Sequence, residues 1–223
     1  MAMPAHDPPL RAAAAQPDGG PPPVHIEDPL ARAAALLRAG DLVAFPTDTV
    51  YGVGALAWQP SAVAKLYHAK LRSAGKAIPV LLADPGDLPL VGRDLSHDAL
   101  RLAARFWPGP LTIVVLRSAS IPDEVTAGGD SVAVRVPNHA LALALIRAAQ
   151  GPLAATSANL SGERSPVTAA EVEAQLGGRI AMILDGGSCP GGVASTVVDM
   201  TGGAPRVLRP GPISEAAIFE ALG

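Results

Sequence analysis

The sequence predicts an α/β protein in which helices pack on a twisted, mixed β-sheet. Hydrophobic residues make up 49% and charged residues 17% of the chain, so a large core can be buried. Segments of helical and of strand character alternate along the chain, which is typical of a sheet covered by helices. Two β-branched segments, residues 111–117 and 131–137, have no helical segment between them, so the sheet should be mixed rather than purely parallel.

The helices are recognised by their end residues and by apolar residues at helical spacing. In the first, residues 28–41, Asp28 can cap the start and Gly40 suits the end. The second is expected at residues 61–71, with Ser61 as its cap. The others are expected at residues 96–106, 139–150, 168–177 and 214–222, and Thr168 is expected to cap the third of these.

The strands are short apolar runs bounded by turn residues. The stretch Tyr51–Gly54, after the first of them, is interpreted as a glycine-rich turn. Besides the two segments named above, strands are expected at residues 42–47, 77–83, 152–158, 180–187, 194–200 and 204–211.

The chain of 223 residues suits one sizeable domain. Residues 1–24 are rich in proline, alanine and glycine and bury too little to offset the entropy of ordering, so a disordered tail is expected there and one folded domain at residues 25–223. The single cysteine, Cys189, excludes a disulfide framework. No signal peptide and no apolar run of roughly 18 residues is present, so we expect a cytoplasmic protein without membrane contact.

Hydroxyl-bearing residues gather where two predicted strands end, which is the usual place for ligands in α/β sheets. Thr47, Asp48 and Thr49 end or follow the first strand, although the alternative is that Asp48 and Thr49 only satisfy backbone groups of a turn. Residues 155–166 form the richer stretch, and a functional loop is favoured there. Its polar members are Thr156, Ser157, Asn159, Ser161 and Ser165.

Cations form the second group of candidates. Lys70 and Arg72 would project from one face of an extended chain and could bind a polyanion such as a triphosphate. The alternative is a solvated helix end where cations complement the helix dipole. The glycine-rich stretch at residues 185–199 and Arg209 are further candidates, with a plain glycine turn and an exposed arginine as the alternative.

Motifs for covalent or metal chemistry are missing from the chain. There is no nucleophile elbow, Walker loop, metalloprotease motif or cysteine pair. The histidines His68, His97 and His139 are scattered singly, so no metal site built from protein side chains is expected. The candidate residues suit positioning and charge neutralisation better than covalent catalysis.

Seven segments then occur in a specific order: FPTDTVYGVG, KLR, WPGPLTIVV, SVAVRVPNH, TSANLSGERSP, STVVD and RVLRPG. Through this ordered set the chain resembles the YrdC-domain family, the threonylcarbamoyl-AMP synthases, from about Leu30 to Ser214 and in the short, single-domain form. The resemblance implies a YrdC-like fold with an open cationic cavity and nucleotidyltransferase activity. It implies that L-threonine, bicarbonate or CO2, and ATP carrying Mg2+ give L-threonylcarbamoyladenylate and pyrophosphate. A downstream tRNA threonylcarbamoyl transferase complex would use the product to modify tRNA.

The resemblance also implies site residues, position by position. Lys70 and Arg72 would be the catalytic cations. Two positions depart from the family pattern: Leu81 stands where some members have a threonine-contacting histidine, and no proline follows Arg72. The threonine site would comprise Thr49, Arg135, Ala155 and Ser195. The ATP site would comprise Lys70, Arg72, Lys76, Ser131, Ser157, Asn159, Ser165 and Arg209.

Two other functions compete with this interpretation. One is a YrdC-like paralogue that binds RNA or a nucleotide without synthase activity; the net charge of -3 and the 3% aromatic content leave room for only a weak RNA contact. The other is carbamoyl transfer, as in hydrogenase-maturation proteins that contain a related domain. Those proteins carry acylphosphatase and zinc-finger segments, which this sequence lacks.

Overall fold

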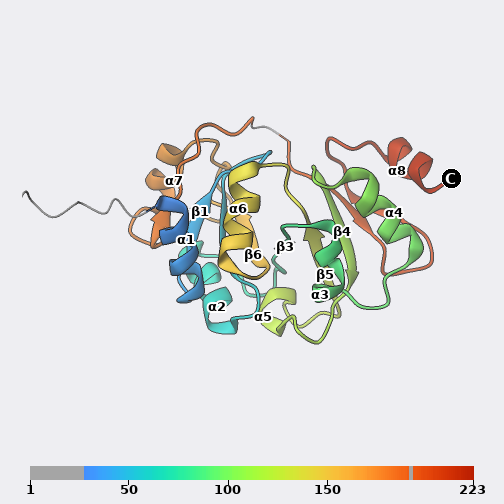
Figure 1. Ribbon diagram of the computed structural model, residues 1–223, viewed down its shortest axis with the longest axis horizontal. Helices are drawn as coiled ribbons and strands as arrows, with labels where there is room; N and C mark the ends of the chain where they lie inside the picture. Colours follow the sequence, from blue (N-terminus) through green and yellow to red (C-terminus); the bar gives the residue numbers. More distant parts are fainter. Residues whose placement is uncertain (1–27, 191–192) are drawn as a thin grey trace, which may run out of the picture.

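The computed structural model describes residues 28–190 and 193–223; the tail predicted at residues 1–24 lies outside them. The helices in the described part are α1 (Pro29–Arg38), α2 (Pro60–Ala69), α3 (Leu88–Val91), α4 (His97–Phe106), α5 (Asp123–Thr126), α6 (Ala140–Ala149), α7 (Ala169–Leu176) and α8 (Glu215–Leu222), with a 3-10 turn at Pro85–Asp87. The strands are β1 (Val43–Phe45), β2 (Gly52–Leu56), β3 (Val80–Leu81), β4 (Leu111–Leu116), β5 (Ser131–Arg135), β6 (Leu153–Ser157), β7 (Met182–Ile183), β8 (Thr196–Asp199) and β9 (Arg206–Arg209) (Figure 1).

The strands of the described residues join one sheet in the order β7-β1-β2-β6-β3-β5-β4-β8-β9. The consecutive strands β4 and β5 pair antiparallel, as their direct succession in the sequence predicted. Strand β3 pairs parallel with β5, and β4 pairs parallel with β8. The sheet is therefore mixed, and the predicted fold class is confirmed.

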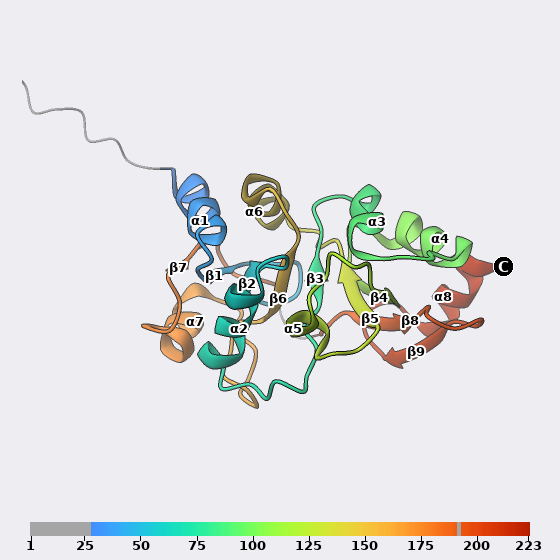
Figure 2. The ribbon, with the colours of Figure 1, turned by 90° about the horizontal axis from the view of Figure 1, so that it is seen from below.

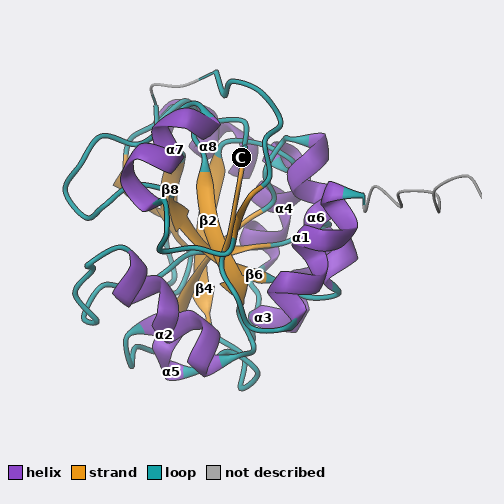
Figure 3. Cartoon of the chain, turned by 90° about the vertical axis from the view of Figure 1, so that its left-hand side faces the viewer, coloured by secondary structure: helices purple, strands orange, loops and turns teal. Residues whose placement is uncertain are grey.

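Helices cover both faces of the sheet. Helices α1 and α6 pack on one side, whereas α2, α5 and α7 lie on the other (Figure 3). The sheet extends along the molecule, with α1 and β7 near one end and β9 and α8 near the other (Figure 2). In the part of the chain that the structure describes, no helix has the length and apolar character that crossing a membrane requires.

The predicted helix ends are largely confirmed by cap hydrogen bonds. Oδ1 of Asp28 accepts from the backbone N–H of Leu30 at 3.0 Å at the start of α1. Thr168 and Glu171 form a capping box at the start of α7. Helix α2 is the exception, because Pro60 is its first residue and Gln59 occupies the cap position, so the assignment of Ser61 as cap is wrong.

The prediction of a glycine-rich turn at Tyr51–Gly54 is wrong. Residues Gly52–Leu56 form β2, a fully buried strand between β1 and β6. A Cβ atom on Gly54 would lie 3.1 Å from Cε1 of Phe45 and 3.3 Å from the carbonyl oxygen of Ala154. Glycine is therefore used here because a ring and a neighbouring strand approach the backbone closely, which the sequence pattern does not distinguish from a turn.

The segment after α2 also differs from the prediction. Lys70 ends the helix with φ −91° and ψ −4°, and Leu71 has a left-handed φ of +51°. The chain is thus not extended here, and the premise that Lys70 and Arg72 project from one face of an extended segment is wrong. The strand expected at residues 77–83 shortens to Val80–Leu81.

Candidate active site

A cavity of about 480 Å³ opens over the central strands of the sheet. Arg135 and Ser157 reach it from the ends of β5 and β6, Thr112 and Ser195 from the starts of β4 and β8, and Thr49 from the segment after β1. Antiparallel pairing places the start of β4 beside the end of β5. Through Leu81, Arg135 is level with Leu153 at the start of β6, so Ser157 lies toward the other end of the strands and the cavity extends along them. The strand-end location agrees with the sequence-based expectation, and the volume suits a small-molecule ligand.

A buried ion pair stands at the inner end of the cavity. Nη2 of Arg135 donates to Oδ1 of Asp48 at 2.5 Å, and the two side chains are only 8% and 15% exposed. Nε donates to the carbonyl oxygen of Gly109 at 2.9 Å, and Nη1 donates to Oγ1 of Thr49 at 3.3 Å. Burial lowers the pKa of Arg135, and the nearby Asp48 opposes that effect. The guanidinium is held by three partners, and the pair as a whole is neutral.

Hydroxyl groups beside this ion pair are oriented by one another. Oγ1 of Thr47 donates to the carbonyl oxygen of Val50 at 2.7 Å and lies 3.0 Å from Oγ1 of Thr49. Because the Thr47 proton is used by Val50, the proton between the two hydroxyls comes from Thr49. Oγ1 of Thr49 is then an acceptor for a cavity ligand, as an ammonium group would require. Thr112 and Ser195 form a second hydroxyl pair at 2.7 Å.

The outer part of the cavity carries positive charge. Nε and Nη2 of Arg209 donate to the carbonyl oxygen of Ser195 at 3.1 Å and 2.8 Å, and burial lowers the pKa of this guanidinium. Arg164, in the loop between β6 and α7, is exposed and lines the same cavity. Neither arginine forms an ion pair with any described residue. The cavity thus combines a neutral inner end with a cationic outer end.

Lys70 is buried behind the cavity wall rather than lining it. The side chain is 1% exposed, and its ammonium group donates to the carbonyl oxygens of Ser157 and Asn159. Its own carbonyl oxygen accepts from the N–H of Ser161 at 2.9 Å. Burial lowers the pKa of Lys70 to about 8, and the positive charge of Arg72 adds to this. Lys70 therefore ties the end of α2 to the loop that follows β6, and a direct contact with ATP stays a prediction.

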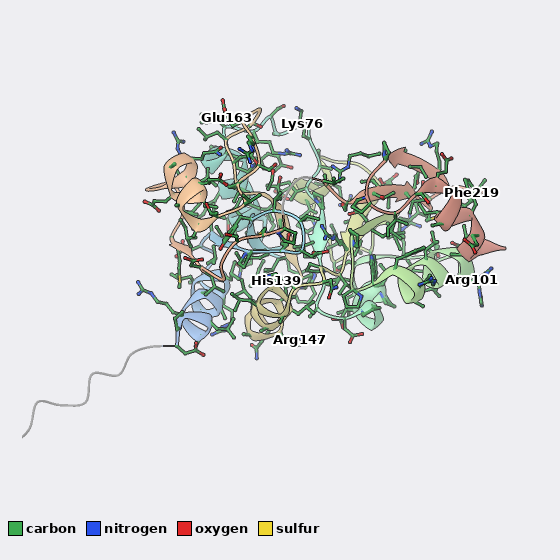
Figure 4. All side chains as sticks on the ribbon, turned by 90° about the horizontal axis from the view of Figure 1, so that it is seen from above. Lys76, Arg101, His139, Arg147, Glu163 and Phe219 are labelled. Carbon is green, nitrogen blue, oxygen red and sulfur yellow. The ribbon has the colours of Figure 1, made fainter. Side chains whose placement is uncertain are left out.

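Arg72 and Lys76 lie outside the cavity lining. Nη2 of Arg72 donates to the carbonyl oxygen of Ala77 at 3.0 Å, and Nε donates to that of Lys76 at 3.4 Å. Arg72 instead lines a separate hollow of about 400 Å³ with residues of α2 and α5. Lys76 is exposed, and Figure 4 shows it at the outer edge of the molecule. Their predicted contacts with ATP also stay predictions.

Of five other residues assigned to the site from the sequence, three line the cavity and two do not. Ala155, Ser157 and Ser165 line the cavity. Ser131 does not line it, because it opens β5 at the opposite end of that strand from Arg135. Asn159 is buried outside the lining, and its Nδ2 donates to backbone carbonyl oxygens of its own loop. Its Oδ1 is buried without a hydrogen-bond partner among the described residues.

Two polar residues of the lining were missed by the sequence reasoning. Thr112 was assigned to an aliphatic strand, although a hydroxyl in such a strand is a usable signal for a polar site. Arg164 directly precedes Ser165, which was assigned, so its position in the same loop was the available signal. Leu81, which departs from the family pattern, lines the cavity as an apolar wall.

Among the described residues, the cavity lining offers no side chain that titrates near neutral pH. No histidine, cysteine, lysine or carboxylate side chain belongs to the lining formed by the described residues. Cys189 is buried, and this burial raises the pKa of its thiol, which disfavours a thiolate nucleophile. Burial lowers the pKa of His139, labelled in Figure 4, with Asp48 opposing the effect. The arrangement suits the positioning and charge neutralisation of ligands.

Gly211 is required for the close approach of the chain beyond β9 to the cavity wall. A Cβ atom there would lie 2.4 Å from the backbone nitrogen of Thr196 and 2.7 Å from the carbonyl oxygen of Ala194. We expect Gly211→Ala to lower the melting temperature by roughly 2–10 °C, because such overpacking typically costs about 1–3 kcal/mol. Gly202→Ala is the matched control, since a Cβ there meets no atom within 4 Å. Equal melting temperatures of the two variants, measured by circular dichroism, would contradict this account.

The chain matches a family model described as "Telomere recombination", Sua5/YciO/YrdC, over residues 35–211. It is 44% identical to the threonylcarbamoyl-AMP synthase of Pyrococcus abyssi over 191 residues, which is 86% of this chain and 56% of the relative. It is 46% identical to the Bacillus subtilis protein of the same name over 195 residues, 87% of this chain and 56% of the relative. The chain thus spans about half the length of these curated relatives.

A solved structure supports the same grouping. The crystal structure of P. abyssi Sua5 complexed with L-threonine superimposes with a TM-score of 0.84 at 43% identity, covering 87% of this chain and 57% of that one. The residues that the family model matches, 35–211, include every described strand of the sheet and all residues of the cavity lining. The extent of the family match and the level of identity show that this chain belongs to the Sua5/YciO/YrdC family.

Proposed function

We propose that the protein is an L-threonylcarbamoyladenylate synthase, a nucleotidyltransferase that converts L-threonine, bicarbonate or CO2, and ATP into threonylcarbamoyl-AMP and pyrophosphate. The names of the two relatives support this proposal, as does the L-threonine bound to the P. abyssi protein. The observation that carries it is the division of the cavity into a neutral inner end and a cationic outer end. Such a cavity suits two ligands, a zwitterionic amino acid and a polyanion.

The inner end has complementary groups for an amino acid. The planar guanidinium of Arg135 suits a carboxylate, and the negative charge of its partner Asp48 disfavours ligands with several negative charges at this end. Oγ1 of Thr49 accepts hydrogen bonds, so it suits the substrate amine before carbamate formation. The hydroxyl pair Thr112–Ser195 can meet the side-chain hydroxyl of threonine.

The outer end has complementary groups for the triphosphate of ATP. Arg209 and Arg164 bring charge that no described carboxylate cancels, and Ser157 and Ser165 add hydroxyls. The ammonium group of threonine first releases a proton to solvent. The resulting amine takes up CO2 and releases a second proton to form a carbamate. One carbamate oxygen then attacks the α-phosphorus, and pyrophosphate leaves with the electrons of the broken P–O bond. The nucleophile is already an anion and needs no general base to deprotonate it. The task of the protein is to align two anions.

Magnesium is proposed to enter with ATP as part of that substrate. The described residues include no cluster of three or more histidine, cysteine or acidic residues suited to a metal ion. Asp48, which contacts the cavity residue Arg135, is bound to it in an ion pair. The lining hydroxyls are weak ligands by themselves and fit an ion whose main ligands are phosphate oxygens.

The product would serve tRNA modification. Threonylcarbamoyl-AMP is a mixed anhydride and needs an acceptor nucleophile, so a transferase complex acting on tRNA is the proposed downstream partner. A cytoplasmic location, where ATP and tRNA are available, is part of the same proposal.

The test is the release of pyrophosphate by the purified full chain. We expect release with L-threonine, bicarbonate and MgATP together, and loss of release when any one of them is omitted. D-threonine is the control for recognition of the amino acid at the inner end. Release that does not depend on threonine, or no release from the complete mixture, would contradict the proposed function.

A further inference from the structure

Arg164 differs from the other cations around the cavity because its guanidinium is unused. Within residues 28–190 and 193–223, that guanidinium donates no hydrogen bond and meets no carboxylate; only its backbone carbonyl oxygen is engaged, by Nε2 of Gln175 at 3.0 Å. The adjacent carboxylate, Glu163, forms no ion pair with it and stands at the outer edge of the molecule in Figure 4. Arg164 therefore presents a full charge and all five N–H donors to a ligand.

Apart from Lys76, which is exposed and outside the cavity lining, the other candidate cations are already bound to the protein. Arg135 is paired with Asp48, and Arg209 uses two of its nitrogens on Ser195. The ammonium group of Lys70 and the guanidinium of Arg72 both donate to backbone carbonyl oxygens. Their positions are held by these contacts, and their donors are partly occupied.

The loop beneath Arg164 is held from both sides, so this exposed side chain rises from an ordered backbone. Gln175 of α7 accepts from the N–H of Leu160 at 3.1 Å and donates to the carbonyl oxygen of Arg164 at 3.0 Å. Nδ2 of the buried Asn159 donates to the carbonyl oxygen of Glu163 at 2.9 Å. Two residues beyond Arg164, the carbonyl oxygen of Pro166 accepts from the N–H of Tyr51 at 2.9 Å. The backbone of Arg164 is therefore preorganised, and only its side chain has to be ordered by a ligand.

We propose that Arg164 binds the β- and γ-phosphates of ATP and stays in contact with them after they leave as pyrophosphate. This assignment rests on the proposed function and adds a residue to its polyanion site. Two uncompensated arginines at the open end, Arg164 and Arg209, call for a ligand with more than one negative charge. A guanidinium with a free planar edge binds phosphate oxygens in a bidentate manner, so the exposed end of the triphosphate is its natural partner.

The test compares the affinities of the full chain for MgATP, inorganic tripolyphosphate and adenosine by titration calorimetry. Arg164→Gln is expected to raise the Kd for MgATP and tripolyphosphate on the order of 10-fold, since a hydrogen bond to a charged group is worth about that factor. The Kd for adenosine should stay within about twofold, because no phosphate contact is involved. Arg164→Lys keeps the charge without the bidentate edge and should give an intermediate Kd.

Arg179→Gln is the matched control. Arg179 is exposed, forms no ion pair with described residues and lines a different hollow, together with Lys65 and His68. Arg179→Gln removes the same charge as Arg164→Gln, so an equal rise of the Kd in both variants would report net charge alone. In steady-state assays Arg164→Gln should raise the KM for ATP and leave the KM for threonine unchanged.

The outcomes separate this inference from the proposed function. Tripolyphosphate affinities that are equal in Arg164→Gln and Arg179→Gln would overturn the role of Arg164, whatever the enzyme does. Tripolyphosphate binding that depends on Arg164 in a chain that releases no pyrophosphate would uphold the residue and reject the synthase. A loss of affinity for a single-stranded RNA oligonucleotide but not for tripolyphosphate would also overturn the inference.

Discussion

Lys70→Met should lower the rate of pyrophosphate release by at least about 100-fold, the usual cost of losing a preorganised cation, while the protein stays folded. The ammonium group fixes the carbonyl oxygens of Ser157 and Asn159, and Ser157 lines the cavity. The positive charge of Lys70 is buried, so water screens its attraction for a negatively charged ligand only weakly. Methionine keeps the length of the side chain but supplies neither charge nor donors.

Stability should change much less than activity in this variant. Loss of the ammonium group leaves two buried carbonyl oxygens without that donor, at about 1–3 kcal/mol each. Removal of the buried charge also relieves its desolvation penalty, and this gain in stability is similar in size to the loss of the hydrogen bonds. Lys65→Met is the matched control on the same helix, since Lys65 is half-exposed and bonded only to Gly40 and Asp41. Normal release by Lys70→Met, or equal losses in both variants, would contradict the assignment.

The same variant gives a pH test. Lys70 in the folded chain releases its proton at a pKa of about 8, below the ordinary 10.5 that applies when the chain is unfolded. Between these values the unfolded state binds more protons, so the free energy of unfolding rises with pH and the burial penalty disappears. We expect the stability of the wild type relative to Lys70→Met, from urea unfolding, to increase as the pH is raised from 7.5 to 10. A constant difference would show that Lys70 is not held in a desolvated position.

Asp48→Ala should be the most destabilising of the single changes considered, at about 3–5 kcal/mol in the free energy of unfolding. It leaves the guanidinium of Arg135 buried without its carboxylate partner, which lies at 2.5 Å in the structure. The freed guanidinium also loses its fixed orientation toward Thr49, so the KM for threonine should rise. Urea unfolding measures the first effect and steady-state kinetics the second.

Asp41→Ala provides the comparison for this prediction. Asp41 forms an ion pair with Lys65 at 2.9 Å, with side chains 41% and 51% exposed, so its loss should cost less than about 1 kcal/mol. Asp48→Asn keeps an acceptor for Arg135 and should lie between wild type and Asp48→Ala. If Asp48→Ala is no worse than Asp41→Ala, the Asp48–Arg135 pair does not organise the inner end.

The sequence was most informative where a local rule acts alone. Helix caps such as Asp28 and Thr168, and the antiparallel succession of β4 and β5, need only neighbouring residues to be recognised. It failed at β2, because Gly52 and Gly54 read as a turn until the ring of Phe45 is placed against the strand. It also failed at Lys70, since the left-handed conformation of Leu71 turns the following residues away from an extended path.

By itself, the sequence determined the alternation of helices and strands, the mixed sheet, and the placement of hydroxyls and cations where strands end. These properties depend on periodicity and on residues close together in the chain. Only the tertiary structure decided which cations share a cavity: it brought Arg135, Arg164 and Arg209 together and placed Lys70 behind the wall and Arg72 outside. Strand register and buried pairings such as Asp48 with Arg135 bring together residues that are far apart in the sequence. A pattern of neighbouring residues contains no information on such contacts.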